Sequence, residues 1–546
     1  MLRTFERIHG STGTREHGSA SNRRRSSWLS LLSALGALSA CLTVTMDADA
    51  HRCAPVVHTR AGALRGTSSD GVDRFLAIPY AAPPVGDLRW RPPAPPARWK
   101  GVRAADTLPP RCAQFDVSDG SEDCLYLNIY RPAHTKRRDR LPVLFYIHGG
   151  SYKVGSAIDN DPSRIAKLTD TVVVMINYRL GQFGFLAHPA LGAEAGDGTS
   201  GEYGLLDQQA ALRWVHDNID AFGGDPRNIT IAGGSAGGWS VCAHLTSPNV
   251  AGLFSRAVIQ SGACFADPLE TAEARGLKYA TENLGCPDAT STECLRQKTT
   301  EELLAADASD TSDDASRPVF GGRVLPEPPN EAIAAGRFHR VPILIGGTRD
   351  EARGDVAFLY PMSEDYFYAF VSGPFGDDTP AVLAEYPLAE YEDPVYALAD
   401  IGLDSSFMGA GACATRRLAL TLAQFVPTFE YEFYDQSAPV PSWLTIPPDY
   451  ELGASHGTDE MYWFDRPFHT VVPLNPIQRQ LANRMVEYLG AFVERGVPKV
   501  RHLPHWPRFE PQHEAVMRFA PYAIEARTDF DEEHRCAFWS SLGYPP

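Results

Sequence analysis

The chain has 546 residues, of which 44% are hydrophobic and 21% are charged. This balance is typical of a globular protein with a large core, and it excludes a wholly disordered or fibrous chain. The formal net charge is −17. A surface of that sign repels nucleic acid and anionic membranes, so we expect no nucleic-acid partner.

Residues 1–50 are typical of a signal or targeting segment. Three arginines at 23–25 precede an apolar run over 28–44, and Ala48-Asp49-Ala50 forms an A-x-A cleavage site. The run is too short and too rich in serine for a membrane span. We therefore expect a secreted or periplasmic protein. A lipoprotein-like box ends at Cys41, so membrane attachment is expected only if Cys41 is lipidated.

After residue 50, short apolar runs alternate with helical patterns. The runs that indicate strands buried on both faces cover 141–148, 171–177, 228–232, 257–260, 341–345 and 429–434. Helical patterns cover 205–221, 236–245 and 477–495. This alternation predicts an α/β fold with a large, mostly parallel central sheet flanked by helices. The sequence shows no internal repeat and no clear linker, so we expect one domain over 51–546.

The sequence Gly233-Gly234-Ser235-Ala236-Gly237 is a G-x-S-x-G motif. A serine at a sharp turn between a strand and a helix points its hydroxyl out of the sheet, and small neighbours are needed because the backbone there is crowded. The apolar run 228–232 precedes the motif, and a helical pattern follows it. This context favours a nucleophilic Ser235 over a plain glycine-rich turn.

A second glycine-rich segment, Gly149-Gly150-Ser151, follows the strand predicted at 141–148. Loops of this kind donate backbone N–H groups to the oxyanion of an acyl-transfer intermediate. We expect the donors to be Gly150, Ser151 and Ala236. A simple turn is the weaker interpretation.

Acyl transfer by serine also needs a base and an acid later in the chain. His456 lies in a loop of small residues, and Glu351 directly follows a predicted strand. The order serine, acid, histidine then fits. The residues alone leave Asp350 open as the acid and leave His148 and His188 open as bases.

The chain has ten cysteines, and an exported protein can oxidise them. Three pairs are suggested by their positions: Cys112–Cys124, Cys286–Cys294 and Cys413–Cys536. Cys242 and Cys264 lie in apolar stretches, where free buried thiols are the expected state, and Cys53 has no evident partner. No cysteine or histidine cluster has zinc spacing, so we expect no metal and no cofactor.

Several further motifs together resemble the type-B carboxylesterase and cholinesterase family, from about residue 57 to residue 541. The most specific is Ser121–Asn128, with the sequence SEDCLYLN. The others lie at 77–90, 177–185, 204–209, 222–226, 260–262 and 536–539.

This resemblance implies an α/β-hydrolase fold and a serine carboxylic ester hydrolase that acts on small-molecule esters. It implies Ser235 as nucleophile, His456 as base and Glu351, in preference to Asp350, as acid. It places Ser261 behind the acid and base as support. It also implies the three oxyanion donors and the three disulfides already named.

The chain departs from the family pattern at four places. Gly234 stands where the family usually has glutamate, Ser151 where it has a third glycine, and Ala352 where glycine usually follows the acid. The loop between Cys112 and Cys124 contains no tryptophan. A quaternary ammonium needs an aromatic face or a negative charge, so these departures argue against a choline-ester specialist.

Two alternatives remain at this stage. One is a catalytically silent binding or adhesion protein, which the intact serine, acid and histidine disfavour. The other is an esterase or lipase specialised for another acyl substrate. The natural ester, the acyl-chain preference and the oligomeric state are left open by the sequence.

Overall fold

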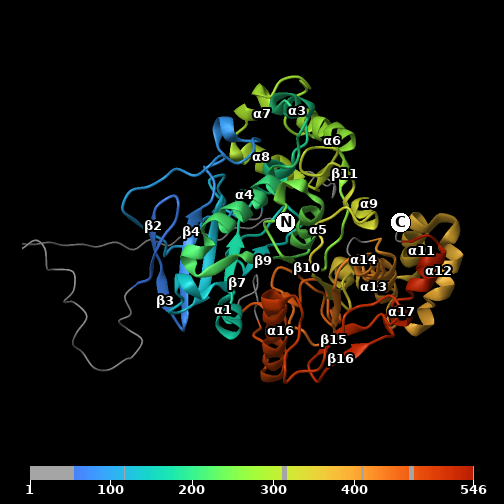
Figure 1. Ribbon diagram of the computed structural model, residues 1–546. Coiled ribbons are helices and arrows are strands. Elements are labelled where there is room, and N and C mark those ends of the chain that lie inside the picture. Colours follow the sequence, from blue (N-terminus) through green and yellow to red (C-terminus); the bar gives the residue numbers. More distant parts are fainter. Residues whose placement is uncertain (1–53, 116, 310–315, 408–410, 466–471, 545–546) are drawn as a thin grey trace, which may run out of the picture. The chain divides into compact units, whose positions relative to one another are not determined.

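A large sheet forms the centre of the fold (Figure 1). The computed structural model describes residues 54–544 except 116, 310–315, 408–410 and 466–471. In the described residues, eleven strands pair in the order β16-β15-β14-β13-β10-β9-β7-β8-β6-β4-β3. Their bounds are β3 Thr67–Ser69, β4 Val72–Pro79, β6 Tyr126–Pro132, β7 Leu141–Ile147, β8 Val172–Ile176, β9 Gly224–Gly234, β10 Arg256–Gln260, β13 Ile343–Thr348, β14 Thr428–Phe433, β15 Val516–Ala520 and β16 Ala523–Arg527.

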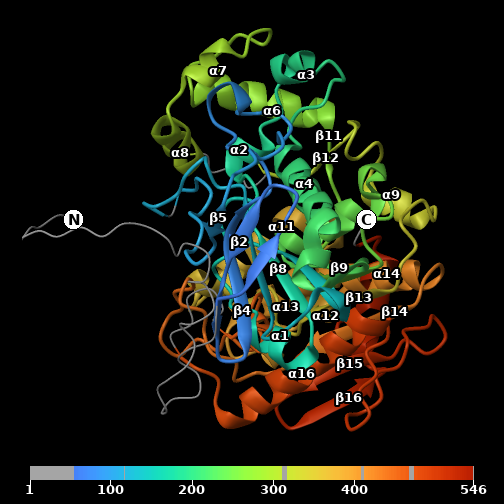
Figure 2. The same cartoon turned by 60° about the vertical axis from the view of Figure 1, so that its left-hand side comes forward.

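The seven strands from β8 to β15 in this order pair in parallel. Antiparallel pairing is confined to the two edges, where β3, β4 and β6 lie on one side and β16 lies on the other. A separate three-stranded sheet of β1 (Val56–His58), β2 (Ala63–Arg65) and β5 (Val102–Ala104) lies near the first edge, which Figure 2 brings forward. The predicted, mostly parallel sheet is confirmed.

Helices cover both faces of the sheet, which explains why its strands are apolar on both sides. One face packs against α4 (Tyr203–Asn218) and α5 (Ala236–Thr246). The other packs against α1 (Ser163–Thr169) and α16 (Pro476–Arg495), which contact each other. In β7, Phe145 faces the first core and Tyr146 the second.

The remaining elements surround this core. The other helices are α2 Gly181–Phe185, α3 Pro189–Ala195, α6 Leu269–Glu282, α7 Glu293–Gln297, α8 Thr300–Ser309, α9 Pro329–Ala334, α10 Arg353–Val356, α11 Glu364–Phe375, α12 Thr379–Glu385, α13 Pro394–Ser405, α14 Ala412–Ala423, α15 Glu460–Trp463, α17 Phe530–Glu533 and α18 Cys536–Ser541. A two-stranded sheet joins β11 (Asp267–Pro268) to β12 (Val319–Phe320). None of the helices in the described ranges is long and apolar enough to cross a membrane.

Local sequence signals set the ends of the predicted helix at 477–495. The side chain of Asn475 accepts hydrogen bonds from the N–H groups of Ile477 and Gln478, and Pro476 occupies the first turn. Gly496 ends the helix with φ of 74°, a conformation that favours glycine. The helix predicted at 205–221 begins at Tyr203 and ends at Asn218.

The three predicted disulfides, Cys112–Cys124, Cys286–Cys294 and Cys413–Cys536, are all present. The expectation of free thiols at Cys242 and Cys264 is wrong, because these residues form a fourth disulfide with a Cα–Cα distance of 5.3 Å. Cys242 lies on α5 and Cys264 follows β10. Since β9 leads directly into α5 and pairs with β10, the two cysteines meet. Cys53, Cys41 and the predicted targeting segment 1–50 lie outside the described residues.

Candidate active site

Ser235 occupies a tight turn between β9 and α5. Its backbone has φ of 54° and ψ of −126°, a region that is costly for a residue with a side chain. A neighbouring position has no room for a side chain: a Cβ on Gly237 would lie 2.1 Å from the carbonyl oxygen of Ile147. The N–H of Ser235 donates to the carbonyl of Gln260 at 2.8 Å, which ties the turn to the end of β10. The hydroxyl-bearing residue remains half-buried, within reach of a ligand.

Ala236 begins α5, so its N–H is one of the first-turn donors that have no partner within the helix. The positive end of the helix dipole also lies at this point. Both features favour a negative charge developing next to Ser235.

The loop Gly149-Gly150-Ser151 packs against this turn. A Cβ on Gly149 would lie 3.0 Å from the Cβ of Ser235, so only glycine allows this approach. Gly150, Ser151 and Tyr152 follow with φ of 99°, 53° and 58°. The carbonyl of Gly150 accepts hydrogen bonds from the N–H groups of two later residues, Lys153 and Val154, at 2.9 Å each. Ser151, the departure from the family pattern, therefore adopts the left-handed conformation that the loop requires.

Glu351 follows β13 and is buried. Its Oε1 accepts hydrogen bonds from the N–H of Thr348 at 2.8 Å and from the hydroxyl of Ser261. Its Oε2 lies 2.5 Å from Nδ1 of His456. Burial raises the pKa of the Glu351 carboxyl, but His456 and these donors outweigh burial and leave the pKa lowered. Glu351 is therefore held as a carboxylate.

His456 lies on the loop before α15, and its N–H donates to the carbonyl of Glu351 at 3.2 Å. Burial opposes protonation of the ring, whereas Glu351 favours it more strongly and raises the pKa of His456 to about 9. The His456 side chain remains 30% exposed. The ring of His456 is thereby held at its Nδ1 and stays partly accessible.

The competing residues are held in other contacts. Asp350 accepts the N–H of Ala454 at 2.8 Å and is only 2% exposed. His148 lies with Nδ1 2.8 Å from the carbonyl of Gly149, and its ring stacks on Tyr178 at 4.4 Å. His188 caps the N-terminus of α3. Glu351 and His456 contact each other, whereas Asp350, His148 and His188 are held in other contacts.

Two acidic residues beside His456 were missed by the sequence reasoning. The carboxylate of Asp459 accepts hydrogen bonds from the hydroxyl of Tyr431 and from the indole N–H of Trp463, each at 3.1 Å. Burial and Glu351 raise the pKa of Asp459 to about 6. Glu460 follows it as the first residue of α15. Their position only three and four residues after His456 was the signal available in the sequence.

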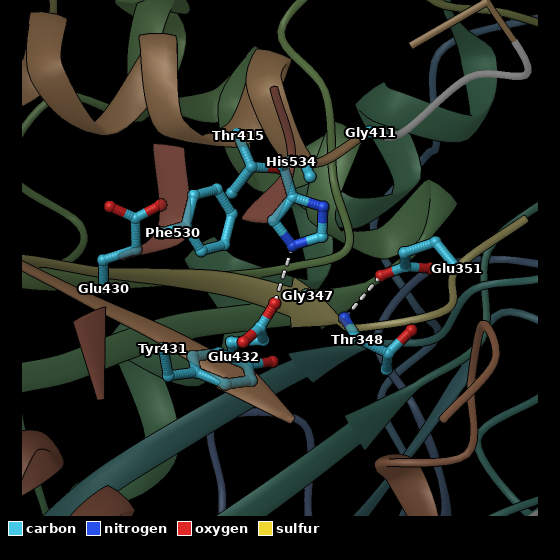
Figure 3. Close-up of a pocket in the computed structure, with 11 residues that line it drawn as sticks. Gly347, Thr348, Glu351, Gly411, Thr415, Glu430, Tyr431, Glu432, Phe530 and His534 are labelled. Atoms are coloured by element: carbon cyan, nitrogen blue, oxygen red, sulfur yellow. Dashed lines mark hydrogen bonds and ion pairs between the residues drawn. The ribbon is translucent and has the colours of Figure 1, made fainter. Parts of the chain in front are cut away.

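A small cavity lies behind Glu351, with a volume of about 20 Å³, enough for one water molecule. Figure 3 shows Glu351 and His534 among the side chains around it. Glu430 also lines it, is fully buried, and has no hydrogen-bond partner for either carboxylate oxygen in the described structure. Burial raises the pKa of Glu430 to about 8, which favours the neutral acid at neutral pH.

Comparison with known proteins gives consistent matches. The family model described as "Carboxylesterase family" matches residues 53–370 and 387–539. The chain is similar to the fumonisin B1 esterase of Sphingopyxis macrogoltabida, with 34% identity over 92% of this chain and 94% of the relative. It is also similar to the human cocaine esterase, with 33% identity over 89% of this chain and 91% of that relative.

Solved structures of carboxylesterases have the same fold. A carboxylesterase from Geobacillus stearothermophilus has 34% identity and a TM-score of 0.75, over 89% of this chain and 99% of that chain. A PNB esterase has 30% identity and a TM-score of 0.74, over 89% of this chain and 100% of that one. The chain therefore belongs to the carboxylesterase family, has the α/β-hydrolase fold and is a carboxylic ester hydrolase.

Proposed function

We propose that the chain hydrolyses carboxylic esters by a two-step acyl transfer on Ser235. Ser235 attacks the ester carbonyl while His456 takes its proton, and the ring then protonates the leaving alcohol. In the second step His456 activates water, which releases the acid and restores the serine. The contact of 2.5 Å between Glu351 Oε2 and His456 Nδ1 carries this proposal, because it fixes the ring and stabilises its protonated form.

The oxyanion is held by backbone N–H groups in this proposal. Ala236 supplies the donor at the start of α5, and Gly150 and Ser151 supply donors from the loop packed against Ser235. Such a donor typically contributes about 3 kcal/mol to the transition state. Because the donor is a main-chain N–H, a serine at position 151 with positive φ can donate to the oxyanion as well as a glycine can.

We also propose that residues 1–50 direct export and are removed. Four disulfides in the described residues support an oxidising destination. Mass spectrometry of the mature protein from the native host tests this. An N-terminus near residue 51 is expected, a lipid-modified Cys41 would show anchoring, and an intact residue 1 would contradict export.

The catalytic proposal is tested with p-nitrophenyl esters from acetate to palmitate and the variant Ser235→Ala. We expect wild-type turnover and a loss of kcat of at least about 10⁴-fold in the variant. The chain-length profile would measure the acyl pocket. Retention of activity in folded Ser235→Ala would overturn the proposal. No turnover of this ester series by folded wild type would point to an unusually narrow specificity or to a binding role.

A further inference from the structure

Backbone conformation does not explain why residue 234, directly before Ser235, is a glycine. It ends β9 and is absent from the residues with positive φ. A Cβ built on it would meet only two side-chain atoms, Oε1 of Glu460 at 3.1 Å and the hydroxyl oxygen of Tyr146 at 3.3 Å. The space that a side chain at position 234 would enter is thus taken by the carboxylate of Glu460.

This carboxylate is held in place from several directions. The hydroxyl of Tyr146, on β7, donates to Glu460 Oε1 at 3.3 Å, and the Asn160 side chain also hydrogen bonds to it. The N–H of Glu460 donates to the carbonyl of Gly457 at 3.3 Å, next to His456. Glu460 as a residue is half-buried.

The charged groups that face Glu460 are His456, Asp459 and Asp159, the last paired with Arg111 at 2.5 Å. Burial and Asp459 raise the pKa of Glu460 to about 7, whereas protonated His456 lowers it. This coupling is reciprocal, so an ionised Glu460 favours the protonated ring of His456.

We propose that Glu460 is a positioning residue for the ester hydrolase, whose carboxylate fills the space left free by Gly234 and stabilises the imidazolium that His456 forms during acyl transfer. This inference rests on the proposed function of Ser235 and His456. It explains why a glycine at position 234 occurs together with an acid at position 460. The acid should therefore work from either position: a glutamate at 234 should stabilise the protonated ring of His456 if the side chain at 460 leaves room for it.

The test compares Glu460→Gln, Glu460→Leu, Gly234→Glu and the double variant Gly234→Glu/Glu460→Leu, with p-nitrophenyl butyrate as substrate. In Glu460→Gln we expect kcat to fall about tenfold with KM within about twofold, because stabilisation of the transition state is lost. The pH midpoint at which kcat/KM rises should also move down, since loss of a negative charge lowers the pKa of the ring.

The double variant should recover most of the activity lost in Glu460→Leu. Gly234→Glu alone should lose activity, because its Cβ would lie 3.1 Å from Glu460 Oε1 and two acids would meet. Glu122→Gln is the matched control: it also replaces a half-buried glutamate, but the partners of Glu122 are Arg89 and Thr300. Its pH midpoint should stay at the wild-type value.

Three results separate the possible outcomes, with thermal unfolding to verify folding of each variant. A wild-type midpoint and kcat in Glu460→Gln would overturn the role of Glu460. A folded double variant no more active than Glu460→Leu would overturn the interchange of positions. Activity that survives in Ser235→Ala would instead overturn the proposed function, independently of Glu460.

Discussion

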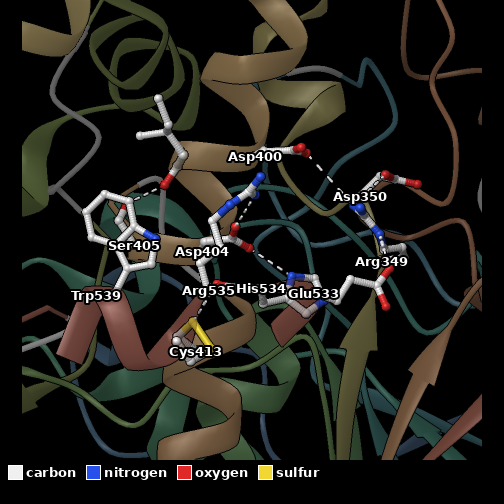
Figure 4. Close-up of polar contacts among 12 residues, drawn as sticks. Arg349, Asp350, Asp400, Asp404, Ser405, Cys413, Glu533, His534, Arg535 and Trp539 are labelled. Carbon is white, nitrogen blue, oxygen red and sulfur yellow. Dashed lines mark hydrogen bonds and ion pairs between the residues drawn. A yellow bond between two sulfur atoms is a disulfide. The ribbon is translucent and has the colours of Figure 1, made fainter. Parts of the chain in front are cut away.

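His534 and His456 both contact carboxylates, and their surroundings differ in how much of each ring remains exposed. His534, before α18, has Nδ1 2.8 Å from Asp404 Oδ1 (Figure 4). Its Nε2 lies 2.8 Å from Glu432 Oε1 (Figure 3). Its side chain is 2% exposed. His456 contacts Glu351 through Nδ1 and keeps 30% of its side chain exposed.

The comparison shows why a raised pKa alone does not mark a catalytic histidine. Burial disfavours both charged rings, and carboxylates raise the pKa of His534 to about 10 and that of His456 to about 9. In His534 both ring nitrogens are committed to carboxylates, so the ring is a buried cation that joins β14, α13 and the C-terminal segment. In His456 the contact with a carboxylate is made by Nδ1, which suits the base that we propose.

The largest effect is expected for His456→Ala. Without its base, Ser235 is not activated, and kcat should fall by about 10⁴-fold or more. The unfolding temperature should change by only a few degrees, since the ring is partly exposed. Steady-state kinetics and calorimetry on the same sample measure both. An equal loss of activity in folded His534→Gln would remove the distinction between the two histidines.

The second prediction concerns stability. His534→Ala removes the cation that the buried Asp404 and Glu432 share, although Arg518 still pairs with Glu432 at 3.0 Å and Arg535 with Asp404 at 3.8 Å. Breaking a buried ion pair costs up to about 3–5 kcal/mol. We expect a large decrease in the free energy of unfolding, with kcat of the folded fraction close to wild type. Denaturant unfolding and active-site titration separate the two quantities.

The triple variant His534→Ala/Asp404→Asn/Glu432→Gln is the matched control, because it also removes the two negative charges that face the ring. It should be more stable than His534→Ala alone. If the single variant is as stable as wild type, then the buried cluster does not hold the C-terminal segment.

The sequence predicted the parts of the fold that depend on local pattern. The apolar runs of β7 and β8 and the caps of α16 needed no distant partner to be recognised. The antiparallel strands β4 and β6 were not predicted, and each of them buries a charged residue. In the structure Asp73 and Arg131 are buried and pair with each other at 3.0 Å, a compensation that only the folded chain provides.

The candidate site also has features that the sequence predicts and features that only the folded chain shows. Ser235, Glu351 and His456 lie in motifs that the family resemblance identifies, although their roles remain proposals. The disulfide between Cys242 and Cys264 and the approach of Glu460 to Gly234 arise from strand order and loop packing. No local pattern encodes these contacts, so sequence reasoning left the cysteines unpaired and overlooked Glu460.

The third prediction uses pH, which acts on the two histidines in opposite ways. The pKa of His534 is about 10 in the folded protein against 6.5 for a free histidine, so its stabilisation is complete below pH 6.5 and is lost as pH rises through about 10. His456 must lose its proton to act as base, so kcat/KM should rise about tenfold per pH unit until about pH 9.

Between about pH 7 and 9 the enzyme should therefore become more active and less stable. Kinetics and thermal unfolding over pH 6–10 test this, and His534→Gln should weaken the pH dependence of stability alone. A stability that stays constant over this range in wild type would contradict the assigned charge of His534.

The smallest effect is expected for Ser261→Ala. The Ser261 hydroxyl is one of two donors to Glu351 Oε1, and a hydrogen bond to a charged group contributes about 1.5–3 kcal/mol. Since the N–H of Thr348 remains, we expect kcat to fall only about tenfold. Ser200→Ala is the matched control, because Ser200 makes the same kind of bond to Glu273 at 2.9 Å outside the site. Equal activities for the two variants would mean that Glu351 is oriented by the backbone alone.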